Sequence, residues 1–450
     1  MVQTIQGLRY NYFLIQSPVS GRVIDLSNKL EHVEYAEDIL LPYVSMQLKI
    51  SATVNIVSEL PIIGGELVAM DIELGSGNFK FGEVNGKNIE EGQNELYVYK
   101  VSGIDSQRQR TTFTLHLVSG EYYKNETTRC KKRYGKDSEN RLKISDIVDE
   151  ILKSDLDTNK EIISDETQNT YSFMGNMRKP FYTIQWLCPK SISSNSTQKS
   201  GEDGEDSTTQ GKANGISGYM FFENKAGFNF RSISRLVSET RESSSDRHGP
   251  YEWRGMGAID SNKLDANFQI INYIVEKNTD IRKALITGLY SNQTAYFNVL
   301  THEMSYYNYN LLDEIDIGTQ LGEDAIDKIP IIGDQTSRYM FRVSDHGVTG
   351  QGEDGLEPSG GENAERTDVA KSLARYNLLF TQSLNVSIPL NTNIKVGDLI
   401  ICKFPRLNQG ATKEQDSKLS GKYLIRSAKH RIKPNENVSY LKLIRDSYGI

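Results

Sequence analysis

Glycine-rich segments at two places in the chain have the residue types of nucleotide-binding loops but the wrong surroundings. Gly350 to Gly355 matches the G-x-G-x-x-G spacing, yet no Val/Ile-rich strand precedes it and Leu356-Glu357-Pro358 follows where a helix should begin. A dinucleotide site needs that strand, turn and helix, because glycine backbone and helix N-terminus together hold the pyrophosphate. Gly82 to Lys87 is one residue too short for a phosphate-binding loop, and Asn88 replaces the Ser or Thr that would hold magnesium. The sequence therefore predicts no nucleotide cofactor.

Metal-ligating and acid–base residues are present, but without a diagnostic spacing. The six histidines show no i, i+4 pairing and have no neighbouring cysteine, and Glu202 to Asp206 lacks the spacing of an EF-hand loop. Carboxylates are plentiful, so a glycosidase-type pair stays open, because such a pair is defined by separation in space. We expect no catalytic, cofactor-binding or metal-binding residue, and we expect His116 and His430, in predicted strands, to be structural.

Composition narrows the class of protein. A length of 450 residues suggests roughly three or four domains. The three widely spaced cysteines indicate neither a disulfide framework nor a zinc site, and they favour folding in a reducing cytosol. The formal charge of -7 argues against nucleic acid as the main partner. No run approaches the roughly 18 apolar residues of a membrane span, and no signal-peptide pattern is present, so we expect a soluble chain without membrane insertion.

An alternating β pattern occurs near the start of the chain. Val44 to Val57 alternates apolar and polar residues at the period of a half-buried strand. Pro61 to Val68 contains a glycine turn that opens a second strand, and Leu96 to Gly103 with Thr111 to Val118 predicts a hairpin.

The same order of elements recurs near the end of the chain, in Ser383 to Leu390, Asn393 to Cys402, Gly421 to His430 and Val438 to Arg445. Alternating strands and Gly-acid turns are common in β proteins, so a chance match stays open, but a duplicated domain with inserted material is the favoured interpretation. The predicted turn residues are Gly64, Gly65, Glu66, Gly397 and Asp398. The residues expected in the core are Ile184, Trp186, Leu187, Val386, Ile388, Leu399, Tyr423 and Ile425.

The middle of the chain changes to a mixed helical and strand pattern. We expect a helix capped by Ser145, a helix containing Ile184 to Leu187, a hairpin at Tyr219 to Phe230, strands within Asn267 to Lys277 and Thr294 to Tyr309, and a helix at Asn363 to Phe380. Residues 191–214 and 347–366 are rich in Ser, Gly, Asp and Glu, so we expect mobile loops or segments fixed by a partner.

These elements predict a β-rich α+β fold with two similar antiparallel β-barrels that flank and enclose a mixed α/β insert. The predicted boundaries are 1–125 for the first barrel, 126–265 for the mixed region with its mobile loop, 266–346 and 367–450 for the second barrel with associated strands, and 347–366 for a flexible insertion.

The combined pattern resembles the central baseplate hub proteins of contractile-tailed bacteriophages, whose fold is shared with the base of the type VI secretion spike. The resemblance extends over most of the chain and is carried by Leu60 to Glu66, Leu384 to Leu390, Val396 to Ile400, Tyr423 to His430 and Tyr440 to Arg445. The chain differs from smaller hub proteins in its two long polar segments, and it shows no C-terminal spike needle or lysozyme module.

The resemblance implies a structural protein without cofactor or enzymatic activity. In such families the two barrels resemble tail-tube subunits and the hub is a homotrimer, so three chains present six barrels that join a hexameric tail tube to a trimeric central spike. The implied partners are further copies of this chain, the tail tube protein, the central spike protein and other baseplate proteins, without nucleic-acid specificity. The implied location is the virion tail baseplate, after assembly in the host cytoplasm.

Two other classes of protein stay open. A trimeric receptor-binding or adhesive tail protein would also be acidic and β-rich, but it should show an exposed aromatic platform for carbohydrate and a short fibrous repeat. A cell-wall polysaccharide hydrolase would reveal itself by a clearing band on a zymogram that a single carboxylate substitution abolishes.

Overall fold

The computed structural model describes most of the chain, in segments separated by short gaps. The described residues are 9–53, 62–74, 77–85, 88–90, 94–107, 110–135, 142–194, 218–238, 250–253, 268–277, 280–299, 302–311, 321, 336–343, 362–406, 415–434 and 436–447. The predicted mobile loops lie outside them except for 191–194 and 362–366, and so do Gly350 to Gly355 and Glu202 to Asp206. The described residues form more strands than helices, which confirms the β-rich α+β class.

Ten strands come from the first 119 residues. They are β1 (Arg9–Gln16), β2 (Val23–Asp25), β3 (Leu30–Asp38), β4 (Ser45–Ala52), β5 (Leu67–Leu74), β6 (Gly77–Phe81), β7 (Glu83–Asn85), β8 (Asn88–Glu90), β9 (Leu96–Gln107) and β10 (Arg110–Ser119). Four of them, β4, β5, β9 and β10, are antiparallel neighbours in the order β4-β10-β9-β5. We call these four strands the N-unit.

The last strands of the chain repeat this arrangement. They are β21 (Gln382–Pro389), β22 (Leu399–Lys403), β23 (Gly421–Lys433) and β24 (Glu436–Arg445). Their order is β21-β24-β23-β22, all antiparallel, so in both halves the first strand pairs with the fourth, the fourth with the third, and the third with the second. We call this set the C-unit.

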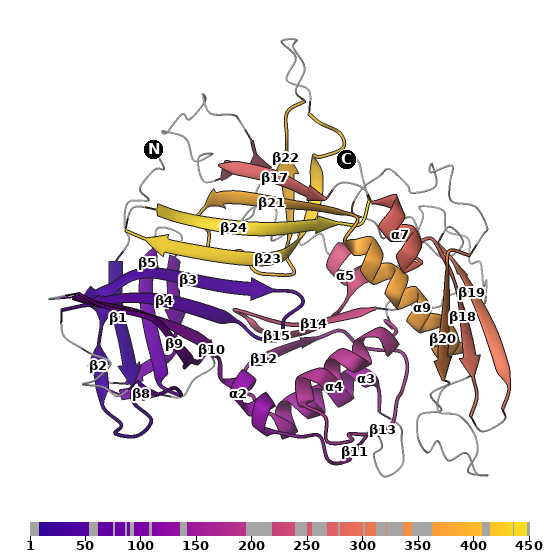
Figure 1. The fold of residues 1–450 in the computed structure, drawn as a ribbon, viewed down its shortest axis with the longest axis horizontal. Coiled ribbons are helices and arrows are strands. Elements are labelled where there is room, and N and C mark those ends of the chain that lie inside the picture. Colours follow the sequence, from indigo (N-terminus) through magenta and orange to yellow (C-terminus); the bar gives the residue numbers. More distant parts are fainter. Residues whose placement is uncertain are drawn as a thin grey trace, which may run out of the picture.

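One continuous sheet contains both units. Its 14 strands run from β17 (Asn272–Lys277) at one end to β2 at the other, and the link is an antiparallel pair between β3 and β23. Figure 1 shows this link, where β3 runs alongside the yellow strands of the C-unit. Among the described residues the ladder does not close on itself, so the two predicted barrels take the form of two similar units within an open sheet.

The insert between the units is mixed α/β. Its elements are α2 (Gly120–Thr127), β11 (Arg133–Tyr134), α3 (Ile144–Glu150), β12 (Glu161–Ser164), β13 (Phe173–Met174), α4 (Pro180–Leu187), β14 (Tyr219–Asn224), β15 (Gly227–Ser232) and α5 (Ile233–Ser238), followed by the short β16 (Tyr251–Glu252). Strand β15 pairs with β14 and, in parallel, with β12. Helix α3 begins one residue before Ser145, which lies inside it and does not cap it.

A second small layer lies beside the C-unit. It combines α7 (Ile281–Thr287), the three-stranded sheet of β18 (Ser291–Phe297), β19 (Met304–Asn310) and β20 (Arg338–Val343), and the long α9 (Glu362–Leu379). Figure 1 places α9 between this sheet and the rest of the molecule. Ala370, Ala374 and Leu378 of α9 are buried in the cluster that includes Tyr309 and Leu311. The helix therefore fastens the small sheet to the C-unit, which follows it directly in the chain.

Burial differs between the two units. The N-unit has a core of its own, to which the C-terminal region contributes only Leu390 and Ile432 among the described residues. The core of the C-unit is shared with the insert, because Met220, Phe222 and Leu236 pack among its strands. The opposite face of β14 carries Tyr219 and Phe221 into a third cluster with the helices α3 and α4.

Candidate functional site

The turn before β5 is built from two glycines and a buried glutamate. Gly64 and Gly65 have φ values of 110° and 84°, a region that residues with a Cβ rarely adopt. The amide of Gly65 donates to the carbonyl of Val98 at 2.7 Å, and the amide of Val98 donates to the carbonyl of Glu66 at 3.0 Å. The Glu66 carboxylate is fully buried and accepts from the amides of Ile63 at 2.7 Å and Gly64 at 3.1 Å. The turn is thereby tied both to β9 and to itself.

The turn before β22 has the same hydrogen bonds. Gly397 has a φ of 90°, its amide donates to the carbonyl of Ile425 at 3.1 Å, and the amide of Ile425 donates to the carbonyl of Asp398 at 3.0 Å. The Asp398 carboxylate accepts from the amide of Lys395, three residues earlier, at 3.1 Å. Glu66 makes the same bond to the residue three positions before it. The two turns therefore share these three hydrogen bonds and a glycine of positive φ at the same position, although Val396, the counterpart of Gly64, does not have a positive φ.

A bulge extends this equivalence into the strands. Tyr99 is skipped in the pairing of β9 with β10, immediately after Val98. Arg426 is skipped in the pairing of β23 with β24, immediately after Ile425. Two independent markers, the turn and the bulge, thus give the same alignment of β9 with β23.

The surroundings of the two turns differ sharply. A Cβ at Gly65 would meet nothing closer than the Cγ of Pro18 at 4.0 Å, and Ile63 beside it is 70% exposed. A Cβ at Gly397 would lie 2.9 Å from the Cζ of Phe222 in the insert. The N-unit turn is open, whereas the C-unit turn is covered by β14 and α5.

Charged residues line the junction between β3 and β23. Glu34 on β3 forms ion pairs with Lys429 and with Arg431, the latter at 3.1 Å. Burial raises the pKa of Glu34, but the hydrogen bonds and charges of these two cations outweigh it, and the pKa is lowered. The carboxylate therefore stays ionised and fixes the register of the junction.

Glu37 lies where β3, the β14–β15 hairpin and the C-unit turn meet. Its carboxyl group accepts from the Tyr35 hydroxyl and the Lys225 amide, both at 2.7 Å, and from the Val396 amide at 3.0 Å. Val396 corresponds to Gly64, so Glu37 takes the bond that Glu66 makes within the N-unit turn. Burial raises the pKa of Glu37 to about 7, against the lowering effect of its hydrogen bonds.

His430 is buried on the same side of the junction. Its Nδ1 lies 2.8 Å from the Ser439 hydroxyl, and its ring stacks on Tyr35 with the centroids 6.2 Å apart. Burial, followed by the charge of Lys225, lowers the pKa of His430 to about 4. The imidazole is therefore neutral in the folded chain, and it serves the structure of the junction.

A buried ion triad lies in the insert, at the place where the insert meets the end of β10. The Nζ of Lys160 lies 2.6 Å from Glu121 on α2 and 2.5 Å from Glu223 on β14, and all three side chains are almost fully buried. The other oxygen of Glu223 accepts from the Ser119 hydroxyl at 2.7 Å, at the end of β10. Thr158 donates to the second oxygen of Glu121 at 2.7 Å. One ammonium group thus connects α2 with the central hairpin of the insert.

The charges of the triad shift one another. Burial lowers the pKa of Lys160, but Glu223 and Glu121 outweigh burial and raise it. Burial also raises the pKa of both carboxyls; Lys160 reverses this for Glu121, whose pKa is lowered, while that of Glu223 stays raised. The lysine is a structural cation with two anionic partners.

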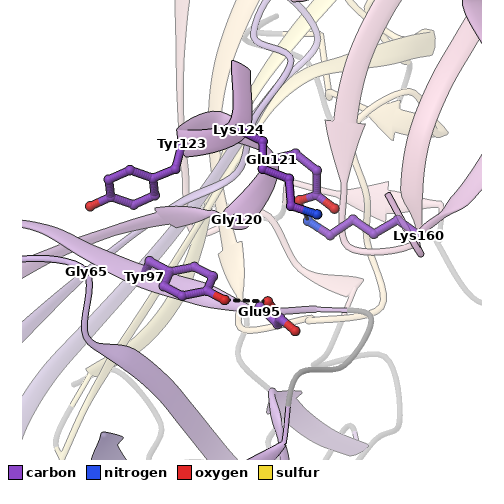
Figure 2. A pocket seen from close by; sticks show the side chains of 8 residues that line it. All are labelled: Gly65, Glu95, Tyr97, Gly120, Glu121, Tyr123, Lys124 and Lys160. Carbon is purple, nitrogen blue, oxygen red and sulfur yellow. Dashed lines mark hydrogen bonds and ion pairs between the residues drawn. The ribbon is translucent and has the colours of Figure 1, made fainter. Parts of the chain in front are cut away.

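A pocket opens beside this triad. Figure 2 shows Tyr97 and Glu95 on one side and Lys160 on the other, and the volume is about 280 Å³. The Tyr97 hydroxyl donates to Glu95 at 2.7 Å, while Lys160 is engaged by Glu121. Tyr123 and Lys124, which also line the pocket, donate to the carbonyls of Val98 and Asp157. These side chains all have partners within the protein, and we assign the pocket no chemistry.

The predicted core residues differ in how deeply they are buried. Val386, Ile388, Tyr423 and Ile425 are buried in the C-unit, and Leu399 is partly buried against it. Ile184 and Leu187 are fully buried on α4, whereas Trp186 is only partly buried. The Trp186 ring lies between two cations, the Nζ of Lys190 at 4.4 Å and the guanidinium of Arg178 at 5.3 Å.

The described ranges contain neither a candidate metal site nor a membrane-spanning helix. No group there of three or more His, Cys, Asp or Glu side chains could hold a metal ion, and His248 and His346 lie outside those ranges. No helix in the described part of the chain is long and apolar enough to cross a membrane.

Comparison with known proteins connects the chain with phage tails. No protein-family model matches. A stretch of 78 residues is 36% identical to the probable baseplate hub protein gp334 of Vibrio phage KVP40, covering 17% of this chain and 18% of that protein. The alignment therefore spans about a fifth of the curated relative.

Solved structures cover far more of the chain. The tail protein from Neisseria meningitidis MC58 superimposes over 98% of both chains with a TM-score of 0.53 and 10% identity. The 43 kDa tail protein of prophage MuSo2 from Shewanella oneidensis covers 97% of this chain and 98% of that chain, with a TM-score of 0.49 and 8% identity. At these identities the likeness concerns the fold. The resemblance to baseplate hub proteins that the sequence suggests is confirmed by the hub relative.

Proposed function

We propose that the chain is the structural hub of a phage tail baseplate, where three copies form a ring that adapts a hexameric tail tube to a trimeric central spike. The protein works by binding its neighbours, without an enzymatic step. It belongs, in this proposal, to the virion tail baseplate, with the tube protein, the spike protein and other baseplate proteins as its partners.

The observation that carries the proposal is the duplication within one chain. Both units have the strand order first, fourth, third, second. Both have a turn in which a glycine of positive φ and the acid after it bond to one residue of the third strand. Two such equivalent units in one chain are what a threefold assembly needs to present six similar units.

Symmetry gives the duplication its purpose. A hexameric tube and a trimeric spike share a threefold axis, and a trimer with two units per chain matches the sixfold partner on one face. The insert and the α9 layer occur once per chain, so they keep threefold symmetry. They are the parts that we expect to meet the spike.

The comparisons support the same role from two sides. The relative in Vibrio phage KVP40 is named a probable baseplate hub protein, and the Neisseria structure is a tail protein that matches nearly the whole chain. A hub must hold its shape under load, and the continuous 14-stranded sheet joins both units into one rigid body of hydrogen bonds.

Mass in solution tests the proposal. Sedimentation of the purified chain should give a species of about 152 kDa, three times the 50.8 kDa chain. Adding the tube and spike proteins of the same particle should shift this species to a larger mass. A chain that stays monomeric with both partners present would contradict the proposal. A zymogram on cell walls should give no clearing band.

A further inference from the structure

The β3–β23 pair links the two units inside the chain. The equivalent strands, β17 and the second half of β9, do not pair with each other within the chain. Strand β23 pairs with β24 on one edge, and on its other edge with β22 first and then with β3. The equivalent strand β9 pairs with β10 on one edge and, on the other, with β5 only at Leu96 and Tyr97. Beyond Val98, no described strand occupies that edge of β9.

A strand equivalent to β3 is also present and has an open edge. β3 pairs antiparallel with β4, the first strand of the N-unit, and β17 pairs antiparallel with β21, the first strand of the C-unit. β3 continues the sheet to β23, whereas β17 ends it among the described strands. Figure 1 shows β17 at the outer border of the C-unit strands, far from β9.

We infer that β17 of one copy pairs antiparallel with the second half of β9 of the next copy, and so repeats between chains the β3–β23 pair within the chain. The inference rests on the proposed trimeric hub and adds the strands and the register that build it. The contact is head-to-tail, so it closes a ring when each unit is rotated by one sixth of a turn from the last.

The internal alignment fixes the register. His430 lies opposite Tyr35 in the β3–β23 pair. Counting from the turns and bulges, the position of His430 falls at Gly103 and Ile104 of β9, where these two residues occupy one step of the ladder with β10. Tyr35 pairs with Met46 of β4, and Val275 pairs with Leu384, which occupies the corresponding position of β21. Val275 is therefore the counterpart of Tyr35.

Each of the two open strands carries one additional residue at this position. β9 gains a residue at Gly103–Ile104, and β17 skips Glu276 in its pairing with β21. Because the two additions lie opposite each other, the new ladder runs without interruption. Ser102 then faces Lys277, Ile104 faces Val275, and Ser106 faces Tyr273.

The side chains at the centre of this register fit a protein contact. Ile104 is 56% exposed and Val275 is 36% exposed, and each lies at or next to the additional residue of its strand. Directly opposed apolar residues on antiparallel strands stabilise pairing, and an open strand edge with exposed apolar residues is a hazard unless it is covered. In this register the Ile–Val contact takes the position of the Tyr35–His430 pair of the internal junction, and Ile274 takes the position of Glu34, so the two kinds of junction are chemically distinct.

Cysteine cross-linking tests the register. In the variant that combines Ile104→Cys with Val275→Cys, the Cβ atoms of position 104 in one copy and position 275 in the next should lie about 4 to 5 Å apart. The two sulfurs should therefore oxidise to a disulfide. Oxidation should convert most of the chain to a trimer that survives denaturation without reductant. Each single variant should stay at monomer mass on the same gel, since a head-to-tail contact never brings one position next to itself. The three native cysteines are all buried, so background linking should be low.

A matched pair of residues controls for simple exposure. Ile274 is 58% exposed and adjacent to Val275, but it points to the other face of the strand. Ile104→Cys with Ile274→Cys should therefore link at least tenfold more slowly. Charge exchange gives a second readout: Ile104→Lys alone and Val275→Glu alone should dissociate the trimer, and the two together should restore it.

The outcomes separate this inference from the proposed function. A native trimer that fails to link at 104 and 275, or links faster through 274, overturns the inference and leaves the hub intact. Covalent chains longer than three copies support the strand pair and overturn ring closure. A chain that is monomeric under every condition overturns both.

Discussion

The N-unit and the C-unit have the same strand order and the same turn, but they are attached to the rest of the molecule by different chemistry. The C-unit shares its hydrophobic core with the insert, and Phe222 packs directly against the backbone at Gly397. The N-unit keeps a separate core, and at the end of its strand β10 the Ser119 hydroxyl donates to Glu223, a member of the buried Lys160 triad of the insert. The insert thus meets the C-unit through apolar side chains and the N-unit through a hydrogen bond to a carboxyl group of the triad.

The turns repeat this contrast on a smaller scale. In the N-unit, Glu66 accepts from two amides of its own turn. In the C-unit, Asp398 accepts from one of the corresponding amides, and Glu37 of β3 accepts from the other. A duplicated element can therefore keep its backbone geometry while the source of its capping bonds moves to a different part of the chain.

The largest expected effect is at Gly397. Gly397→Val adds strain at positive φ and drives a side chain into Phe222, so we expect a loss of roughly 4 kcal/mol of unfolding free energy. Gly65→Val shares the φ but has open space around it, so its loss should be about 1 to 3 kcal/mol. Urea denaturation measures both. Equal losses would show that packing does not distinguish the two turns.

Removal of the triad cation comes next. Lys160→Met leaves Glu121 and Glu223 buried together, and we expect a loss of about 3 kcal/mol at neutral pH. The loss should shrink in mild acid, because the raised pKa of Glu223 lets it take up a proton. Lys124→Met, at an exposed lysine of the same pocket, is the control and should change little. A Lys160→Met protein as stable as the control would refute a stabilising role of the buried triad.

The junction should show two opposing pH dependences. The pKa of Glu37 rises from 4.5 to about 7 on folding, so its contribution to stability is present below pH 4.5 and is lost as pH rises to about 7, a change of about 3 kcal/mol. The pKa of His430 falls from 6.5 to about 4, so its contribution is present above pH 6.5 and is lost as pH falls to about 4.

The two slopes nearly cancel between pH 4.5 and 6.5, because their signs are opposite and their sizes similar. Glu37→Gln removes one of them, so the unfolding free energy of this variant should rise with pH across that interval while the wild type stays comparatively flat. Chemical denaturation at a series of pH values measures the profile. Parallel profiles for the two proteins would count against a protonated Glu37 in the junction.

The smallest loss of unfolding free energy should come from removing the capping carboxylates. Here the N-unit turn should lose more than the C-unit turn, the reverse of the order expected for the glycines. Glu66→Ala leaves two amides of the N-unit turn without their acceptor and should cost about 2 kcal/mol. Asp398→Ala removes one such bond while Glu37 keeps the other, so about 1 kcal/mol is expected. A larger loss at Asp398 would mean that the C-unit turn depends on its own acid more than on β3.

Sequence patterns predict the duplicated strands well, because β4, β10 and β21 alternate along most of their length and the second strand of each unit follows a Gly-acid turn. The same reasoning passes over β1, β2 and β3, and β3 is the strand that links the units. Its residues Leu30 to Asp38 mix charges with few apolar side chains, since Glu34 and Glu37 are satisfied by partners about 190 to 400 positions away. Pairing over such distances leaves no local signal.

The candidate site was likewise predictable only where its structure is local. Gly65, Glu66, Gly397 and Asp398 are visible in the sequence, because a turn is a local structure. Lys160 and Glu223 are single charged residues with no motif around them, and their role depends on α2, β12 and β14 meeting in space. Glu223 is the single acidic residue of the largely apolar hairpin Tyr219 to Phe230, and this is the signal that could have pointed to it.

Electron micrographs of the purified protein test the central claim most directly, that three chains with two equivalent units imitate a sixfold ring. Class averages viewed along the axis should show six similar lobes around a central hole, with threefold differences outside the ring where the inserts lie. Particles of single-chain size, or rings with a number of lobes other than six, would contradict it.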